Sequence, residues 1–254
     1  MRIEQRETLP RAAFVLEQSG IHPLLAQLYA SRGVQNKEEL EDDLAKLIPP
    51  SAMKGTQEAA QLLALAITQN KKLCIVADYD CDGATACAVG IRGLRLLGAK
   101  NVDFLVPDRV VDGYGLTASI SERVKATGAD VLITVDNGIA SIEGVEVANR
   151  LGLQVLITDH HLPAVFEGEI VLPQANVIVN PNQPFCDFSS KSISGVGVMF
   201  YVLLALRSLL RSQGVFDASN QPRLDRLLPL VALGTVADVV KLDRNNRVLV
   251  SQGL

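Results

Sequence analysis

Residues 73–83 read LCIVADYDCDG, a run of five apolar or small residues followed by aspartate at every second position, Asp78, Asp80 and Asp82. A short apolar run without alternation is typical of a strand that is buried on both faces, as in parallel sheets. Ligands of open parallel sheets bind beyond the carboxyl ends of the strands. The stretch therefore predicts a buried strand with a polar site directly after it.

Four more apolar runs along the chain end in polar residues. They cover residues 102–106, 131–135, 155–158 and 177–179, and they end in Pro107-Asp108, Asp136-Asn137-Gly138, Asp159-His160-His161 and Asn180-Pro181. Helix-like segments lie between the runs, at residues 83–97, 117–127 and 141–151, and two apolar ones follow, at 195–211 and 224–240. This alternation predicts an α/β fold with a doubly wound, mainly parallel sheet flanked by helices.

The first 50 residues predict an N-terminal helical extension, and residues 51–254 predict the domain with the sheet. His22-Pro23 can open a helix with Leu24, Leu25 and Leu28 on its inner face, and we interpret His22 as structural. The chain ends at Leu254 without a cap or a polar tail, which we interpret as the end of a fragment cut near a domain boundary.

Composition bounds the class of protein. Of the 254 residues, 48% are hydrophobic and none is Trp, so a sizeable aliphatic core is expected. A net charge of −4 argues by itself against a nucleic-acid partner, but the carboxylates of a metal site add charge that bound ions neutralise. The N-terminus does not resemble a signal peptide, and the longest apolar run, residues 198–206, is shorter than the roughly 20 residues of a membrane span. We predict a cytoplasmic protein with reduced thiols and no membrane partner.

The acids at the strand ends are the candidate site. A single aspartate there is more often a turn or helix-cap residue than a ligand. Three acids in five residues, joined by Asp136 and Asp159 at the same edge, repel one another unless a cation joins them. Carboxylates with one or two imidazoles suit Mn²⁺ or Mg²⁺, with Zn²⁺ and Co²⁺ as alternatives. Five or more ligands favour two ions, about 3.5–4 Å apart, that activate water for phosphodiester hydrolysis.

Other residues are candidates for binding a phosphate. Arg109 can pair with a phosphate or with a nearby acid, and Tyr114 can support a substrate or simply pack. Gly195 and Gly197 open a helix whose backbone N–H groups could hold a phosphate, although a lone G-x-G is more often a packing feature.

These motifs, in this order, resemble the catalytic core of the RecJ family of single-strand-specific 5′→3′ exonucleases, in the DHH phosphoesterase superfamily. The resemblance runs from about Ile21 to the end of the chain. It rests on residues 76–83 (VADYDCDG), 107–116 (PDRVVDGYGL), 134–139 (TVDNGI), 158–163 (TDHHLP), 179–182 (VNPN), 194–198 (SGVGV) and 231–240 (VALGTVADVV). The DHH-associated and oligonucleotide-binding domains that such proteins carry are not expected in this chain.

The resemblance implies a role for each matched residue. The implied metal ligands are Asp78, Asp80, Asp82, Asp136, His160 and Asp238. Asp80, Asp82 and Asp136 also take part in catalysis together with His161, which contacts the scissile phosphate, while Asp159 orients its neighbours. Asp238 lies inside an apolar segment, where a buried acid needs a partner, and only the resemblance singles it out.

The implied function is a divalent-metal-dependent exonuclease with two Mn²⁺ or Mg²⁺ ions. Its substrate is single-stranded DNA in repair and recombination, and a helicase and a single-strand-binding protein are further expected partners. One alternative is a DHH phosphoesterase for short oligonucleotides, cyclic dinucleotides or pyrophosphate. Such relatives carry a histidine four residues before the first acid, where this chain has Cys74. The second alternative is a non-catalytic scaffold, but scaffolds lose metal ligands and this sequence keeps them.

Overall fold

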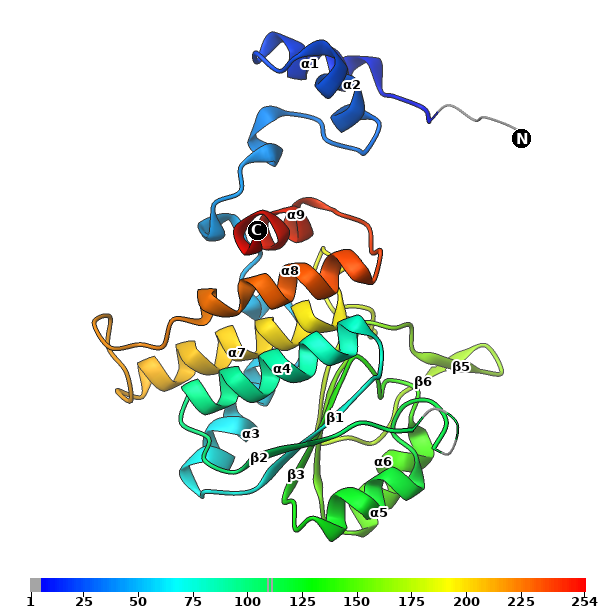
Figure 1. Ribbon diagram of the computed structural model, residues 1–254. Coiled ribbons are helices and arrows are strands. Elements are labelled where there is room, and N and C mark those ends of the chain that lie inside the picture. Colours follow the sequence, from blue (N-terminus) through cyan, green and yellow to red (C-terminus); the bar gives the residue numbers. More distant parts are fainter. Residues whose placement is uncertain (1–5, 109, 111) are drawn as a thin grey trace. The chain divides into compact units, whose positions relative to one another are not determined.

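The computed structural model describes residues 6–108, 110 and 112–254, and the chain divides into two compact units, Met1–Lys46 and Leu47–Leu254 (Figure 1). The division falls four residues before the expected boundary between residues 50 and 51. Residues that follow it are tied to the larger unit, because the Ile48 amide donates to Asn245 Oδ1 at 3.1 Å.

The larger unit is built on a sheet of five parallel strands in the order β2-β1-β3-β4-β7. The strands are β1 (Leu73–Ala77), β2 (Val102–Leu105), β3 (Val131–Val135), β4 (Gln154–Thr158) and β7 (Val177–Val179). Every residue of β1 and β3 is buried, as expected from their unbroken apolar runs. The predicted doubly wound parallel sheet is confirmed. The last residue of each strand lies within one residue of the predicted position.

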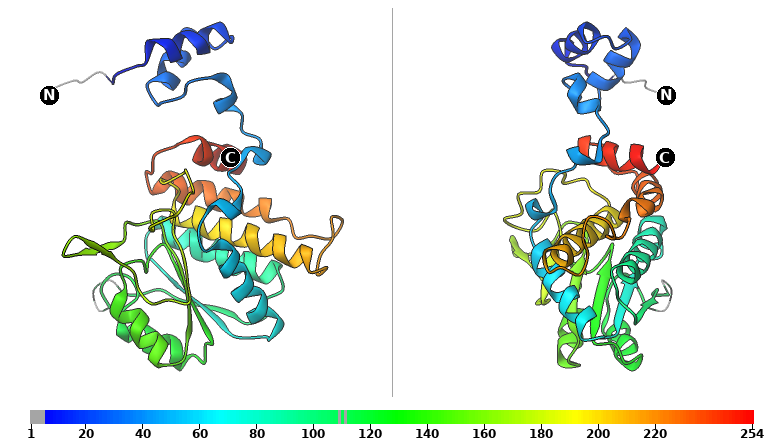
Figure 2. Two further views of the ribbon diagram at one scale, coloured as in Figure 1. Left: turned by 180° about the vertical axis from the view of Figure 1, so that it is seen from behind. Right: turned by 90° about the vertical axis from the view of Figure 1, so that its left-hand side faces the viewer.

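Helices pack on both faces of the sheet (Figures 1 and 2). Helices α5 (Ala118–Ala126) and α6 (Ile142–Arg150) cover the face on which Val76 and Leu132 point. Helices α4 (Cys81–Leu96) and α7 (Gly195–Ser212) cover the other face. They approach closely there, since a Cβ on Gly90 of α4 would lie 2.8 Å from Ile75 and 3.4 Å from Met199.

Three more helices pack beside or beyond α4 and α7. Helix α3 (Thr56–Thr68) packs on α7, α8 (Leu228–Ala237) packs on α4, and α9 (Arg244–Gly253) packs on α8. By length and composition α7 could cross a membrane, but 67% of it is buried within the fold. Its apolar character is therefore explained by its place between α3 and α4.

Some elements differ from the sequence predictions. The helix expected over residues 224–240 is a 3₁₀ turn, η4 (Leu224–Leu227), followed by the shorter α8. Helix α9 and the antiparallel pair β5 (Ala164–Phe166) and β6 (Glu169–Val171) were not predicted. The short 3₁₀ helix η3 (Pro50–Ala52) leads into the turn before α3.

The smaller unit is helical, as expected. It contains α1 (Pro10–Gln18), α2 (Pro23–Ala30) and the 3₁₀ helices η1 (Lys37–Leu40) and η2 (Leu44–Lys46). His22 caps α2 by accepting a hydrogen bond from the Leu24 amide at 3.3 Å, in keeping with a structural role.

The predicted inner face of α2 is wrong. Leu24, Leu25 and Leu28 are 61%, 46% and 43% exposed. The buried residues of α2 are instead Ala26 and Ala30, one turn apart, whose small side chains let the two helices approach closely.

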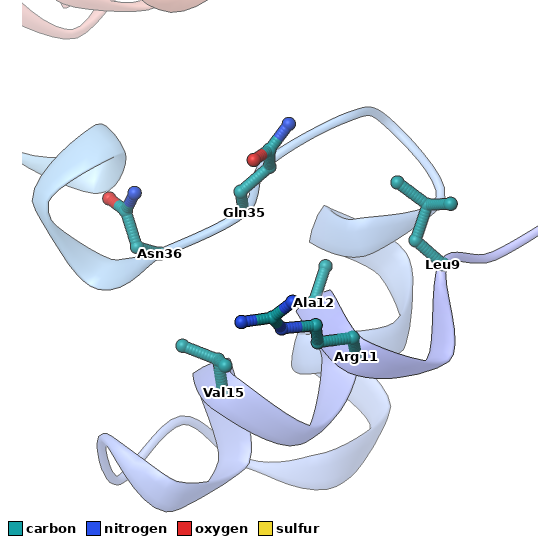
Figure 3. A pocket seen from close by; sticks show the side chains of 6 residues that line it. All are labelled: Leu9, Arg11, Ala12, Val15, Gln35 and Asn36. Atoms are coloured by element: carbon teal, nitrogen blue, oxygen red, sulfur yellow. The ribbon is translucent and has the colours of Figure 1, made fainter.

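A pocket of about 510 Å³ lies in the smaller unit, lined by Leu9, Arg11, Ala12, Val15, Gln35 and Asn36 (Figure 3). Its lining carries one charged side chain, Arg11, and neither carboxylate nor imidazole. It therefore lacks the donors of the predicted metal site, which lies in the larger unit.

Candidate metal centre

The sheet register brings three of the predicted acids together. Ala77 of β1 pairs with Val135 of β3, which pairs with Thr158 of β4. The next residues along these three strands are Asp78, Asp136 and Asp159, so all three lie at one edge of the sheet. All three are buried, with at most 7% of their surface exposed.

Asp78 and Asp80 form one side of the site. Asp80 caps α4 by accepting a hydrogen bond from the Gly83 amide at 2.8 Å, so this helix begins two residues earlier than predicted. Burial raises the pKa of Asp78 above its ordinary value. Oxygen atoms of Asp78, Asp80 and Asp136 all lie within 4.8 Å of one another, which is close enough to share one cation.

Tyr114 reaches Asp78 from the loop after β2. Its hydroxyl hydrogen-bonds the Asp78 carboxylate, and burial together with this acid raises the tyrosine pKa. The loop is anchored by Asp112, which accepts from the Asp108 amide at 2.7 Å and from Arg123 at 2.8 Å. Asp108 therefore belongs to the loop and not to the cluster. Arg109 lies outside the described residues.

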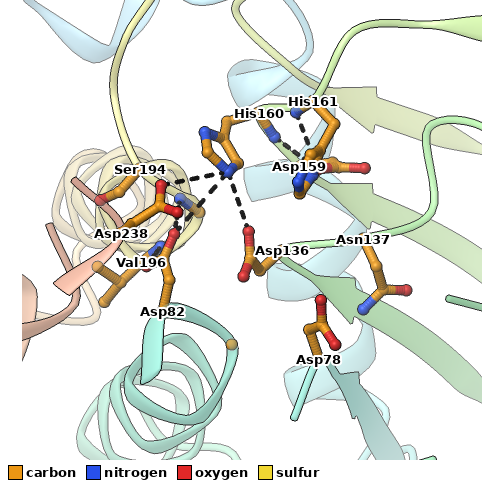
Figure 4. Close-up of polar contacts among 12 residues, drawn as sticks. Asp78, Asp82, Asp136, Asn137, Asp159, His160, His161, Ser194, Val196 and Asp238 are labelled. Atoms are coloured by element: carbon orange, nitrogen blue, oxygen red, sulfur yellow. Dashed lines mark hydrogen bonds and ion pairs between the residues drawn. The ribbon is translucent and has the colours of Figure 1, made fainter. Parts of the chain in front are cut away.

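Asp136 and His160 occupy the centre of the cluster (Figure 4). His160 Nε2 lies 3.1 Å from Asp136 Oδ1, 3.6 Å from Asp238 Oδ2 and 4.0 Å from Asp82 Oδ2. Burial raises the pKa of Asp136 to about 8. Burial lowers the pKa of His160, but the contact with Asp136 outweighs it and the value rises to about 9.

Asp136 is held in an unusual backbone conformation. Its φ of +62° lies in the left-handed region, which few residues other than glycine adopt without cost. The conformation turns the carboxylate towards α7, where Gly195 leaves room for it. A Cβ on Gly195 would lie only 2.5 Å from Asp136 Oδ1.

Asp82 lies against the N-terminus of α7 and is 1% exposed. Its carboxylate accepts hydrogen bonds from the Gly195 amide at 2.6 Å and the Val196 amide at 2.9 Å. Burial raises its pKa to about 6, although these two amides favour the charged form. The unpaired N–H groups of a helix N-terminus suit a carboxylate in this way.

This arrangement corrects the predicted role of the two glycines. The Gly195 amide binds Asp82, and the Gly197 amide donates to the capping Ser194 hydroxyl at 3.4 Å. Both N–H groups already have internal acceptors, so they are not open to a phosphate. Gly195 serves instead to let α7 approach the carboxylates of Asp82 and Asp136.

The two histidines point to different surroundings. The His160 side chain is 12% exposed and faces the acids, whereas the His161 side chain is 46% exposed. His161 Nδ1 lies 2.7 Å from Asp159 Oδ1, and this hydrogen bond raises the His161 pKa. His161 also lies in a group of potential metal ligands with Asp136 and His160, so its implied role as a phosphate contact stays a prediction.

Asp159 anchors the histidine pair. Its Oδ1 accepts from the amides of His160 at 2.7 Å and His161 at 3.1 Å, and its Oδ2 accepts from the Ile139 amide at 2.9 Å. Burial alone would raise its pKa, but these donors and the His161 ring hold it below the ordinary value. These contacts favour the ionised carboxylate and hold the backbone of both histidines.

Asp238 joins the cluster from the C-terminal end of α8. Burial raises its pKa. The sequence pattern alone did not find it, because an acid at the end of an apolar helix is also an ordinary surface residue.

Two further residues support the site and were missed. The side-chain amide of Asn182 donates to the His160 carbonyl at 2.6 Å, and that of Asn180 donates to the His161 carbonyl at 3.0 Å. They fix the backbone of the histidine pair from the loop after β7. The sequence offered one signal for these two residues, namely that they follow the apolar run of β7.

The donor set fits divalent cations. Three buried atoms, Asp136 Oδ1, His160 Nε2 and Asp238 Oδ2, have no hydrogen-bond partner within the described part of the chain. Asp136 lies in one group of potential ligands with Asp78 and Asp80, and His160 lies in another with Asp82 and Asp238. A third group joins Asp136 and His160 to His161. Oxygen donors with one or two imidazoles suit Mn²⁺ and Mg²⁺, and the shared residues suit two neighbouring ions.

Fold and site together define a class of protein. Residues 72–235 match the DHH family, N-terminal domain, and the chain belongs to this family. It is 50% identical over 234 residues to the single-stranded-DNA-specific exonuclease RecJ of Escherichia coli, an alignment that covers 91% of this chain and 40% of that protein. It is 39% identical over 254 residues to the RecJ of Bacillus subtilis, covering 98% of this chain and 30% of that protein.

Solved structures give the same result. The structure of RecJ in complex with Mn²⁺ from Thermus thermophilus matches with a TM-score of 0.74 and 32% identity, over 97% of this chain and 34% of that one. An exonuclease RecJ bound to manganese matches with a TM-score of 0.67 and 35% identity, over 79% of this chain and 47% of that one. The family resemblance expected from the motifs is confirmed, and the chain spans about 40% of the length of the Escherichia coli relative.

Proposed function

We propose that this chain is the catalytic, metal-binding part of a 5′→3′ exonuclease that hydrolyses the phosphodiester bonds of single-stranded DNA. Two Mn²⁺ or Mg²⁺ ions are its cofactors, and residues 51–254 form the DHH phosphoesterase domain. The observation that carries the proposal is the pair Asp136 and His160, which lie 3.1 Å apart and each belong to two groups of potential metal ligands. The names of the RecJ relatives support the substrate.

The ligands fall into two sets, one for each ion. Asp78, Asp80 and Asp136 hold one ion, and Asp82, His160 and Asp238 hold the other. Two bound divalent ions supply Lewis-acid contacts to the phosphate and lower the pKa of water, which phosphodiester hydrolysis at neutral pH requires.

His161 and Tyr114 act at the open side of the site. The hydrogen bond to Asp159 raises the pKa of His161 and so favours the protonated, half-exposed ring, which can donate to a phosphate oxygen. Tyr114 orients Asp78 through its hydroxyl, and its ring packs edge-on against His161 with centroids 6.2 Å apart.

The alternative substrates are less well supported. Relatives for cyclic dinucleotides have a histidine at the position of Cys74. Here this thiol is fully buried in the apolar cluster under α5 and α6, where it offers no ligand to the site. A scaffold without catalysis is also less well supported, because the described ligands all lie at one edge of the sheet. Work in the cytoplasm with a helicase and a single-strand-binding protein remains part of the proposal.

The deciding experiment is digestion of 5′-phosphorylated, end-labelled single-stranded DNA with Mn²⁺, next to a cyclic dinucleotide, by this chain and by a longer one. We expect mononucleotides from the DNA and loss of at least about 100-fold in rate for Asp136→Ala and His160→Ala, because each removes a ligand shared by two groups. Asp217→Asn, in the exposed loop after α7, is the control and keeps wild-type activity. Full activity in Asp136→Ala or in His160→Ala would rule out the two-ion site.

A further inference from the structure

Phe185 is the most exposed aromatic residue in the described part of the chain, with 93% of its surface open to solvent. Its φ of +61° lies in the left-handed region. For a bulky aromatic residue this conformation is an outlier that persists only where the surrounding structure imposes it, and such outliers gather at functional sites. Neither the exposed ring nor the left-handed backbone of Phe185 contributes to the metal centre.

The surrounding loop holds Phe185 in place on both sides. Lys191 Nζ donates to the carbonyls of Pro181 at 2.6 Å and Cys186 at 2.7 Å. The Lys54 amide donates to Cys186 Sγ at 3.4 Å, and Lys54 Nζ donates to the Pro184 carbonyl at 3.0 Å. Since hydrogen bonds fix the residues before and after it, the ring is presented to solvent by a firm backbone.

A positive charge accompanies the ring. Lys54 Nζ lies 5.6 Å from the ring centroid, which is within the range of a cation–π contact. Lys54 is exposed, and the nearest acid along the loop is the exposed Asp187. An exposed aromatic ring beside a lysine is the combination with which proteins bind single-stranded nucleic acid, because bases stack on the ring and phosphates pair with the cation.

Phe185 lies close to the metal centre along the chain. Asn182, three residues before Phe185, donates its side-chain amide to the His160 carbonyl at 2.6 Å. Three residues span at most about 10 Å of chain. Phe185 therefore stands near the edge of the sheet where the histidines lie, within reach of a strand that occupies the site.

We propose that Phe185 and Lys54 form a stacking subsite for one base of the single-stranded substrate, with Lys54 on a neighbouring phosphate. The subsite rests on the proposed function and adds a nucleotide contact outside the metal centre. A protein partner fits less well, because the side chain over the ring is the charged Lys54.

The chain contains no tryptophan, so Phe185→Trp creates a single fluorescent reporter at the subsite. We expect an oligothymidylate with phosphorothioate linkages, added with Mn²⁺, to quench this fluorescence by stacking, whereas inorganic phosphate leaves it unchanged. The matched control is Phe104→Trp, on the edge strand β2 at the opposite side of the sheet from β7, where we expect no quenching.

Affinity gives a second measurement. Phe185→Ala should weaken binding of the oligonucleotide about 5- to 150-fold, the range found for removal of one stacked base contact. Lys54→Ala should weaken binding and reduce the slope of log affinity against log salt by about 0.7, as for one phosphate contact to a single strand. Thermal unfolding of each variant checks that the fold is kept.

The outcomes separate the subsite from the proposed function. If wild-type protein degrades the DNA but the fluorescence of Phe185→Trp is not quenched and Phe185→Ala binds normally, the subsite is wrong and the exonuclease stands. If wild-type protein neither binds nor degrades the DNA, both are wrong. A change in the fluorescence of Phe185→Trp with protein concentration alone, without DNA, assigns the ring to an interface between copies and overturns the subsite.

Discussion

At the scale of single residues, Asp159 decides which way the histidine pair faces. It accepts hydrogen bonds from both histidine amides and from the His161 ring, so the ring that enters the cluster belongs to His160. The carboxylate belongs to none of the groups of potential metal ligands in the described chain and acts through its neighbours. The residue is therefore best tested through the titration of His161.

Asp159→Asn should lower the pKa of His161, because the charge that favours the protonated ring is removed. Loss of hydrogen bonds to a charged acceptor should also reduce the free energy of unfolding by roughly 2–4 kcal/mol. The chain has three histidines, so NMR titration can follow His161 with His22, in the other unit, as an internal control. An unchanged His161 pKa in the variant would contradict this role.

The buried acids also predict how the metal-free protein responds to pH. Burial raises the pKa of Asp136 from 3.8 to about 8, and Asp136 raises that of His160 from 6.5 to about 9. Both groups bind protons more tightly when folded, so their contribution to stability falls as pH rises from about 4 to about 9. Bound cations replace these protons, and metal affinity should rise over the same range.

The check is urea unfolding in EDTA at pH 5, 7 and 9, for wild type and for Asp136→Asn. The stability of wild type relative to the variant should fall with rising pH, since the side-chain amide of the variant does not titrate and no longer raises the His160 pKa. If the stability of wild type relative to the variant instead grew with pH, burial would not be what raises the pKa values of Asp136 and His160.

At the scale of elements, the site depends on how closely α7 approaches β3. Gly195 makes this approach feasible, and its amide also binds Asp82. Gly195 therefore makes room for one carboxylate and hydrogen-bonds another. Of the two interpretations that the sequence left open, phosphate binding and packing, the structure favours packing.

Gly195→Ala should lower Mn²⁺ affinity by at least about 10-fold, because the new methyl group would lie 2.5 Å from Asp136 Oδ1 and must displace that carboxylate. Gly90→Ala, on α4, is the matched control. Its Cβ would meet the ends of two flexible side chains, Ile75 at 2.8 Å and Met199 at 3.4 Å, which can move, and alanine favours a helix by about 1 kcal/mol. Isothermal titration with Mn²⁺ compares the two variants. Equal affinities would show that the position of the Asp136 carboxylate does not depend on the close approach of α7.

The elements also show where prediction from sequence works. The strands were found because their unbroken apolar runs report burial on both faces, a local property of the chain. The hairpin of β5 and β6 was missed because its residues are largely exposed and lack a regular apolar pattern. Helix α9 was missed because its sequence is polar, and its position comes from packing on α8.

At the scale of the whole molecule, the cluster of buried carboxylates should make stability depend on metal. Their like charges repel one another in the metal-free protein, and a cation relieves this. The effect concerns the larger unit, since the described part of the smaller one supplies none of the clustered acids.

Mn²⁺ at 100 times its dissociation constant should stabilise the protein by about 2.7 kcal/mol and raise the Tm by roughly 5–10 °C. EDTA should reverse the increase. Differential scanning calorimetry of wild type and of His160→Ala makes the comparison, with Asp217→Asn as the control. An equal increase in His160→Ala would place the metal elsewhere.

The sequence by itself determined the parallel sheet and the set of polar residues at its edge. Both follow from local patterns, namely apolar runs that end in acids, and the sheet register then brings Asp78, Asp136 and Asp159 side by side without further information. The resemblance of the motifs added Asp238, which no local pattern marks.

Only the tertiary structure decided how these residues are used. It showed that Asp82 binds the start of α7, that Tyr114 reaches Asp78, and that Asn182 fixes the backbone of His160. It also turned Leu24, Leu25 and Leu28 outwards, against expectation. The physical reason is the same in each case: these contacts join elements far apart in the chain, and their geometry depends on how closely helices pack, which no stretch of sequence records on its own.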